Sequence, residues 1–205
     1  MTGSIPTVLE DQRLAVVDVE GNGQQPPEII EVAVLSVDGN GAGEHLRDWL
    51  IRPERPITQI VTRKVHGISN ADVASCPPWS AVASDVEALL RDRILVAHNA
   101  TVEHRVLGAH LPNWRPPLVL DTLRLAKHVW PGRTSYGLDQ LTKEADLDTN
   151  AVNEQRYHRA RYDTWCAWQL LRALTEHSRL DWAGLVKVAA LPGFVLPDEP
   201  EEGLW

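Results

Sequence analysis

The sequence has few cysteines and no long apolar run. Its 205 residues include two cysteines, Cys76 and Cys166, which stand ninety positions apart and lack the spacing of a metal-binding pair. This excludes a disulfide scaffold and a cysteine-based zinc site, and we expect both thiols to be reduced. No stretch of about 18 apolar residues is present, and the N-terminus lacks the apolar core of a secretory signal. We therefore expect a cytoplasmic protein that does not enter a membrane.

The sequence also has fewer basic than acidic residues. The chain has 20 Lys and Arg residues against 28 Asp and Glu residues, which gives a net charge of −8. A protein with this balance does not coat nucleic acid nonspecifically, because the phosphates repel it. Binding at one place is still open, since small basic clusters beside His158 and His66 could each contact a few phosphates. These clusters are Arg156, Arg159 and Arg161, and Arg63 with Lys64.

The length and composition indicate one catalytic domain followed by a tail. With 205 residues and 43% hydrophobic content, the chain can bury one sizeable core and has no room for two full domains. We expect the domain to cover residues 1–179 and the tail to cover residues 180–205. The tail should be partly extended, because its last part is acidic and interrupted by prolines. A protein partner bound through this tail is a further expectation.

Short apolar segments alternate with turns and helical patterns along the chain. Three strands come first, and helices and strands alternate after them. We expect a mixed α/β sheet with helices on its faces. The expected strands are 14–20, 29–37, 44–52, 93–97 and 118–121, and the expected helices are 79–91, 100–110, 121–128, 137–145, 160–174 and 182–190.

Two acidic side chains stand at the end of the first expected strand. Asp18 and Glu20 interrupt a nearly continuous apolar run that ends at Gly21-Asn22-Gly23. Side chains two positions apart on a strand point the same way, about 7 Å apart. Two like charges at a buried strand end need a cation to neutralise them, unless the strand frays there and both acids lie in solvent.

Two further acids interrupt the apolar faces of expected helices. Glu103 lies on the apolar stripe of helix 100–110, and Asp163 lies on that of helix 160–174. A solvated acid would normally take the other side of its helix. Four carboxylates from three distant segments, each expected to point inward, predict a site for Mg²⁺ or Mn²⁺, which prefer oxygen ligands.

His158 precedes Asp163 by five positions, so on a regular helix the two would point about 140° apart. His158 reaches the carboxylates only if it lies in the loop or first turn that opens the helix. From there it could act as a general base toward an attacking water. The alternative is an ordinary surface histidine in the basic segment 156–161.

The order and spacing of these residues resemble the DEDDh family of 3′–5′ exonucleases, the group that includes RNase T and the proofreading subunit of bacterial DNA polymerase III. The resemblance extends over about residues 12–176. The matching residues are Asp18 and Glu20 for the first motif, His98, Asn99 and Glu103 for the second, His158 and Asp163 for the third, and His66-Gly67-Ile68 for the segment that the family places beside the terminal nucleotide.

The resemblance implies a ribonuclease H-like fold and a two-metal-ion nuclease. Two Mg²⁺ or Mn²⁺ ions would be held by the four carboxylates, with His158 as the general base. The substrate would be the 3′ end of single-stranded DNA or RNA, and the product a nucleoside 5′-monophosphate. The substrate contacts would come from Gly21, Asn22, Gly23, His66 and Asn99.

Two departures from the family pattern leave alternatives open. Glu103 stands where the family usually has Asp, and Gly21-Asn22-Gly23 stands where it usually has Thr-Thr-Gly. One alternative is a hydrolase of dinucleotides or other small phosphoesters. Another is a catalytically decayed module that binds nucleic-acid ends or proteins. The sequence does not separate DNA from RNA, because that depends on how the pocket meets the 2′-hydroxyl.

Overall fold

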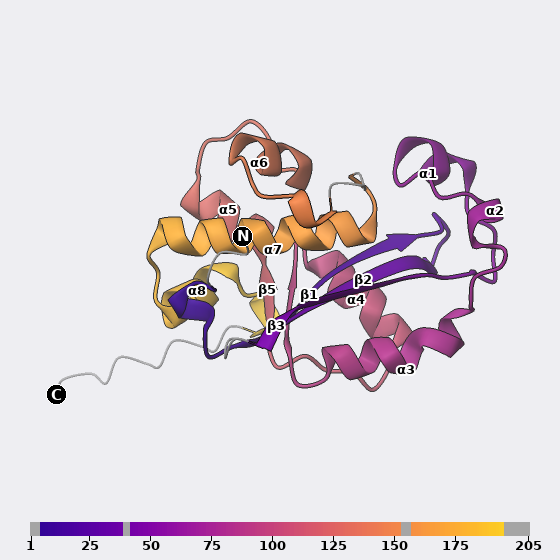
Figure 1. Cartoon of the computed structure of the whole chain (residues 1–205), viewed down its shortest axis with the longest axis horizontal. Helices are drawn as coiled ribbons and strands as arrows, with labels where there is room; N and C mark the ends of the chain where they lie inside the picture. Colours follow the sequence, from indigo (N-terminus) through magenta and orange to yellow (C-terminus); the bar gives the residue numbers. More distant parts are fainter. Residues whose placement is uncertain (1–4, 39–41, 153–156, 195–205) are drawn as a thin grey trace.

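The computed structural model describes residues 5–38, 42–152 and 157–194, apart from the side chains of residues 42–44 and 62–63. A five-stranded sheet in the order β3–β2–β1–β4–β5 forms its centre (Figure 1). Strand β2 pairs antiparallel with β1 and β3, whereas β4 pairs parallel with β1 and β5. The strands are β1 (Arg13–Gly21), β2 (Ile29–Asp38), β3 (Ala42–Leu50), β4 (Ile94–Ala97) and β5 (Val119–Asp121).

Strand β1 lies in the middle of the sheet and is buried on both faces. Leu14 and Val16 pack into one apolar cluster, which includes the buried side of the last long helix. Ala15 and Val17 pack into a second cluster on the opposite face. Because side chains alternate between the faces of a strand, Asp18 continues the face of Leu14 and Val16.

Helices cover both faces of the sheet (Figure 1). Helix α7 covers one face and contacts β1, β2 and β3, while α3 and α4 pack against the other. None of the described helices is both long and apolar enough to cross a membrane. The helices are α1 (Gln59–Lys64), α2 (Asn70–Val73), α3 (Trp79–Leu90), α4 (Thr101–His110), α5 (Thr122–Val129), α6 (Leu138–Glu144), α7 (Ala160–Ser178) and α8 (Trp182–Ala189), with 3-10 turns at Thr7–Leu9, Asn150–Val152 and Pro192–Phe194.

The predicted mixed sheet with helices on its faces is confirmed. Every expected strand and helix occurs, with ends shifted by a few residues. The sequence did not indicate α1 and α2, because helices of six and four residues are too short to show an apolar period. These two helices lie beside the loop that follows β1, since His66 between them is bonded to Gly21.

The segment that follows residue 180 packs against the core of the sheet and α7. Leu185 and Ala189 of α8 are buried in the same cluster as α7. The Leu191 N–H donates to the carbonyl of Val119 in β5 at 3.0 Å. Residues 195–205, where an extended tail and a protein partner were expected, lie outside the described residues.

Gly23 allows α1 to lie close to the loop that follows β1, and we expect Gly23→Ala to destabilise the protein by about 1–3 kcal/mol. Gly23 has a φ of +75°, and a β-carbon there would come within 3.0 Å of the Val61 methyl groups and closer still to the Thr58 hydroxyl. Gly132→Ala is the matched control, because Gly132 has a φ of +80° but no atom within 4 Å of the added carbon. Urea unfolding of both variants measures the difference, and equal losses of stability would show that α1 does not press on Gly23.

Candidate active site

Asp18 and Glu20 lie at the carboxyl end of β1, on the face that α7 covers. They stand opposite Ala33 and Glu31 of β2, and both are half-buried. The parallel strand β4 ends beside them, so the helix that follows β4 begins at the same edge of the sheet. Carboxyl ends of neighbouring parallel strands are where α/β proteins gather functional side chains.

Glu103 comes from the first turn of α4 and is buried. Its Oε2 atom has no hydrogen-bond partner in the described structure. A buried carboxylate oxygen without a donor is costly, unless a cation lies next to it. The donor set around Glu103 therefore fits a hard divalent cation, which takes carboxylate oxygens as ligands.

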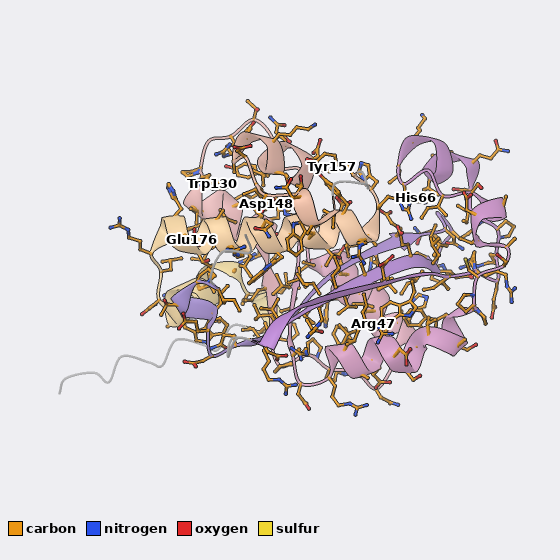
Figure 2. All side chains as sticks on the ribbon, viewed as in Figure 1. Arg47, His66, Trp130, Asp148, Tyr157 and Glu176 are labelled. Atoms are coloured by element: carbon orange, nitrogen blue, oxygen red, sulfur yellow. The ribbon has the colours of Figure 1, made fainter. Side chains whose placement is uncertain are left out.

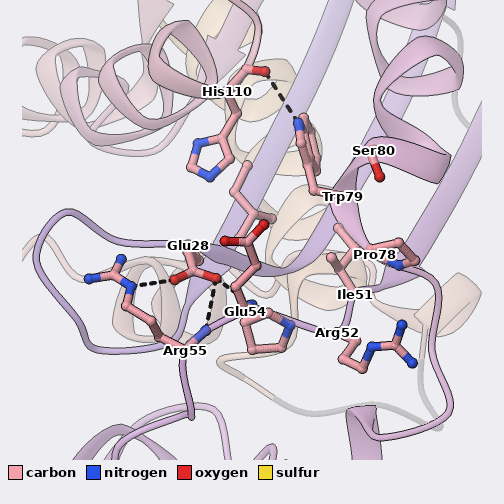
Figure 3. Close-up of a pocket in the computed structure, with 11 residues that line it drawn as sticks. Glu28, Ile51, Arg52, Glu54, Arg55, Pro78, Trp79, Ser80 and His110 are labelled. Atoms are coloured by element: carbon pink, nitrogen blue, oxygen red, sulfur yellow. Dashed lines mark hydrogen bonds and ion pairs between the residues drawn. The ribbon is translucent and has the colours of Figure 1, made fainter.

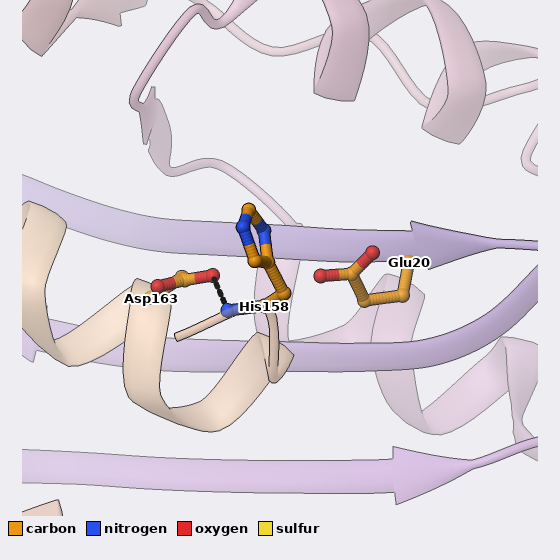
Figure 4. A group of neighbouring side chains, drawn as sticks. All are labelled: Glu20, His158 and Asp163. Carbon is orange, nitrogen blue, oxygen red and sulfur yellow. Dashed lines mark hydrogen bonds between the residues drawn. The ribbon is translucent and has the colours of Figure 1, made fainter. Parts of the chain in front are cut away.

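Asp163 comes from the first turn of α7, and it lies beside His158 and Glu20. One carboxylate oxygen of Asp163 accepts a hydrogen bond from the His158 backbone N–H at 2.9 Å. Ligand atoms of Glu20, His158 and Asp163 lie within 4.8 Å of one another, and the His158 side chain stands between the two carboxylates (Figure 4). His158 occupies the loop just before α7, with a φ of 60°, as the sequence required for it to reach the site.

Burial and repulsion from neighbouring carboxylates raise the pKa values of all four carboxyl groups. Burial is the largest cause for each of them, and it brings the pKa of Glu20 and of Glu103 to about 8 and that of Asp163 to about 7. The pKa of Asp18 is also raised well above its ordinary value, by burial and then by Asp163, Glu20 and Glu103. The structure thus brings the four predicted ligands into one electrostatic cluster, which only added positive charge can keep ionised near neutral pH.

The loop that follows β1 is built around Asn22, whose side chain is buried. The side-chain oxygen Oδ1 of Asn22 accepts hydrogen bonds from the backbone N–H groups of Gln24 and Glu28, at 3.1 and 3.0 Å. Its amide nitrogen donates to the carbonyl of Arg55 at 3.3 Å. Both ends of the Asn22 side chain therefore have partners inside the protein, and these bonds hold the loop in shape.

The His66 side chain, labelled in Figure 2 close to α1 and α2, also has hydrogen-bond partners within the protein. The Ile68 N–H donates to Nδ1 at 3.0 Å, so Nε2 carries the proton and donates to the Gly21 carbonyl at 3.2 Å. Burial lowers the pKa of His66, which keeps the ring neutral. His66 thus ties the segment between α1 and α2 to the end of β1.

Asn99 lies at the turn between β4 and α4, with its side chain exposed. Its φ is 68°, and its backbone N–H donates to Asp121 Oδ1 at 3.0 Å. The same Asp121 oxygen accepts the Leu123 N–H at 2.8 Å and caps α5. His98, the residue before, donates from Nε2 to the Tyr136 carbonyl at 2.9 Å. These bonds fix the turn and leave the Asn99 carboxamide facing solvent.

Two acids that were not predicted as site residues lie next to the cluster. Asp121 is the charged neighbour that raises the pKa of Glu103 most, and Glu31 stands opposite Glu20 on β2. Glu31 interrupts an apolar strand as Asp18 does, so the same signal could have identified it. Of the predicted phosphate contacts, Arg156 and the Arg63 side chain lie outside the described parts of the chain.

A cavity of about 420 Å³ lies apart from the carboxylates, among residues that include Glu28, Arg52, Arg55 and Trp79 (Figure 3). Two of its charged groups form an ion pair, in which Glu28 accepts a hydrogen bond from Arg55 Nε at 2.5 Å. None of the four clustered carboxylates lines it. The candidate active site is therefore the carboxylate cluster and not this cavity.

Three comparisons bear on what this chain is similar to. A family described as exonuclease (RNase_T) matches residues 15–171. The chain is 29% identical over 170 residues to a PolC-type DNA polymerase III of Streptococcus mutans, and 32% identical over 149 residues to the 3′–5′ exonuclease DinG of Bacillus subtilis. These matches take 80% and 68% of this chain, but it spans only 11% and 16% of the lengths of the two relatives.

The fold has a close structural neighbour in exonuclease X, solved in complex with 5′ overhanging duplex DNA. The two chains superpose with a TM-score of 0.70 and 28% sequence identity, over 85% of this chain and 98% of the other. The predicted ribonuclease H-like fold is thereby confirmed.

We expect the metal-free protein to lose stability as the pH rises from about 6 to about 8. The folded carboxyl groups have pKa values of about 7 to 8 at Asp163, Glu20 and Glu103. The unfolded groups have pKa values near 4, so the folded state binds more protons in this window and its stability falls as they leave. Mg²⁺ should raise the Tm more at about pH 8 than at about pH 6, because it binds the ionised cluster.

Thermal melts at the two pH values, with and without Mg²⁺, measure this dependence. Glu103→Gln removes one titrating group and should flatten it. A metal-free Tm that rises between the two pH values would contradict the carboxylate cluster.

Proposed function

Because this chain belongs to the RNase_T exonuclease family and is of the DEDDh type, we propose that it is a metal-dependent 3′–5′ exonuclease that releases nucleoside 5′-monophosphates from DNA or RNA. One observation carries the proposal. Carboxylates from β1, α4 and α7 converge at one edge of the sheet, and one of their buried oxygens has no partner within the described protein. A fold has no structural use for such a repelling group.

The relatives support the reaction class more than the substrate. DinG is named a 3′–5′ exonuclease, and exonuclease X was solved with the overhanging end of a DNA duplex. Since this chain spans about a tenth to a sixth of the two curated relatives, their other activities do not transfer to it. We therefore propose a nucleic-acid 3′ end as the substrate and carry over no polymerase role.

The family generally depends on divalent metal, and an acidic cluster suited to it is present. We propose that Asp18, Glu20, Glu103 and Asp163 hold two ions, Mg²⁺ or Mn²⁺. When bound, such ions neutralise the carboxylates and stabilise negative charge on the phosphate and on the leaving oxygen. The chain's own contribution is to hold four ligands from three elements at one edge of the sheet.

In the proposed reaction, His158 takes a proton from the attacking water. Its side chain is exposed and lies next to Glu20 and Asp163. Its backbone is held by the hydrogen bond to Asp163, which limits how far the ring can move. A neutral imidazole in this position acts as a general base.

Substrate contacts come from the rim of the site. The exposed carboxamide of Asn99 and the backbone of Gly21 and Gly23 are the groups proposed to meet the terminal nucleotide. Asn22 and His66 act one step behind them, because their side chains hold the loop after β1 in place.

Two rival functions make different predictions about substrate. A hydrolase of small phosphoesters would cleave dinucleotides faster than longer strands, and a binding module would bind ends without cleaving them. Incubation with labelled single-stranded DNA, RNA and dinucleotides, with and without Mn²⁺, separates the three. Mononucleotides that appear one by one from the 3′ end, only with metal, support the proposal, whereas binding without cleavage contradicts it.

Removing any one ligand charge should abolish activity without unfolding the protein. We expect Asp18→Asn, Asp163→Asn and Glu103→Gln each to lower turnover by at least about 10²-fold, while Mn²⁺ binds more weakly. The metal-free Tm should stay the same or rise, because each substitution relieves repulsion. Glu176→Gln, an exposed acid on the same helix as Asp163, is the control. A ligand variant with normal turnover shows that its residue does not bind the metal.

Loss of His158 should affect the rate and leave metal binding intact. General-base catalysis contributes about 10² to 10⁴ in rate, so we expect His158→Ala to lower kcat by that order. The Mn²⁺ concentration for half-maximal activity should change little. Steady-state kinetics over a range of Mn²⁺ concentrations measure both quantities, and a near-normal kcat would make His158 a surface histidine.

A further inference from the structure

A buried ion pair stands directly behind the proposed catalytic histidine. Glu31 of β2 is almost fully buried, and Arg159 contacts it through two guanidinium nitrogens. Arg159 Nε lies 3.1 Å from each carboxylate oxygen, and Nη2 lies 2.6 Å from Oε1. The backbone N–H of Ala160 adds a third donor to Glu31 at 3.0 Å. All these donors come from the start of α7.

The pair anchors the residue that follows His158 in the chain. His158 has a φ of 60°, a conformation that a residue with a β-carbon adopts only when its surroundings hold it there. The backbone N–H of His158 is bonded to Asp163 of α7. The next two residues, Arg159 and Ala160, are bonded to Glu31 of β2. The loop is thus fixed both to α7 and to the sheet.

The same contacts leave Arg159 little freedom to do anything else. The edge of the guanidinium that carries Nε and Nη2 is used by Glu31, so it is not available to the phosphate contact that the sequence suggested. Glu31 also faces Glu20 across the strands, where an unpaired charge would add to the repulsion in the cluster. Arg159 neutralises the Glu31 charge through the ion pair.

We propose that Arg159 and Glu31 are positioning residues that fix the His158 loop over the carboxylate cluster. This inference rests on the proposed function for its kinetic consequence. Its structural consequence, an ordered His158 backbone, stands without any activity. Neither residue touches the substrate in this account.

A neighbouring ion pair provides a matched control. Arg161 Nη1 lies 2.6 Å from Asp48 Oδ1 of β3, and both side chains are 32% exposed. This pair also joins the first turn of α7 to the sheet. Within the described residues, however, neither partner forms a hydrogen bond with the His158 backbone or with the buried carboxylates. Substituting Arg161 therefore weakens the link between α7 and the sheet but leaves the Glu31–Arg159 pair intact.

The kinetic experiment compares Arg159→Gln and Arg161→Gln in both the wild-type and the His158→Ala background. We expect Arg159→Gln to lower kcat roughly 10- to 100-fold, while KM and the Mn²⁺ requirement change by less than about threefold. In the His158→Ala background, Arg159→Gln should have little further effect, because the group it positions is gone. Arg159→Lys should rescue only part of the rate, since one ammonium does not reproduce the two-nitrogen contact.

The structural experiment measures hydrogen exchange of the His158 backbone amide by NMR in Mg²⁺. This amide should be protected in wild type and in Arg161→Gln, and it should exchange faster in Arg159→Gln and Glu31→Gln. Unchanged protection in those two variants would overturn the proposal, whether or not the protein degrades nucleic acid. A kcat loss that persists in full without His158, or a loss confined to KM, would also overturn it. An inactive wild type with the expected exchange pattern would instead count against the proposed exonuclease function alone.

Discussion

The burial of four neighbouring carboxylates is the constraint around which this structure is organised. These groups are buried or half-buried at one edge of the sheet: Asp18, Glu20, Glu103 and Asp163. Burial raises the pKa of each of them, and nearby carboxylates raise it further. The fold provides partial compensation, because Glu103 and Asp163 lie in the first turns of helices, where the helix dipole favours negative charge. A pair of divalent ions would supply the positive charge that is still needed to neutralise the four carboxylates.

The surrounding polar groups hold the site together from outside. Asn22 and His66 shape the loop after β1, Asp121 fixes the turn that presents Asn99, and Glu31 with Arg159 anchors the start of α7. Each of these groups is buried or half-buried, with its hydrogen bonds directed to backbone or to one charged partner. The carboxylates can therefore repel one another without moving apart, because these bonds hold the backbone segments that carry them in place.

The sequence was sufficient to predict which acids the fold brings together, but not the contacts that hold them there. An acid on an apolar stripe is visible in a sequence, so the convergence of Asp18, Glu20, Glu103 and Asp163 could be predicted, and so could the place of His158 before the helix. The internal hydrogen bonds of Asn22 and His66 could not be predicted, because the sequence does not show which backbone groups a polar side chain will meet. The Glu31–Arg159 contact joins residues 128 positions apart, and no local pattern predicts such a pair.

Locating metal in the protein is the most direct test of the proposed carboxylate site. Crystals soaked in Mn²⁺ and measured with anomalous scattering at the manganese edge should show two peaks, both in contact with carboxylate oxygens of Asp18, Glu20, Glu103 or Asp163. One of them should lie beside Glu103 Oε2, the buried oxygen that has no partner in the described protein. Absence of manganese at this edge of the sheet under conditions that support nuclease activity, or a metal bound elsewhere, would contradict the central claim.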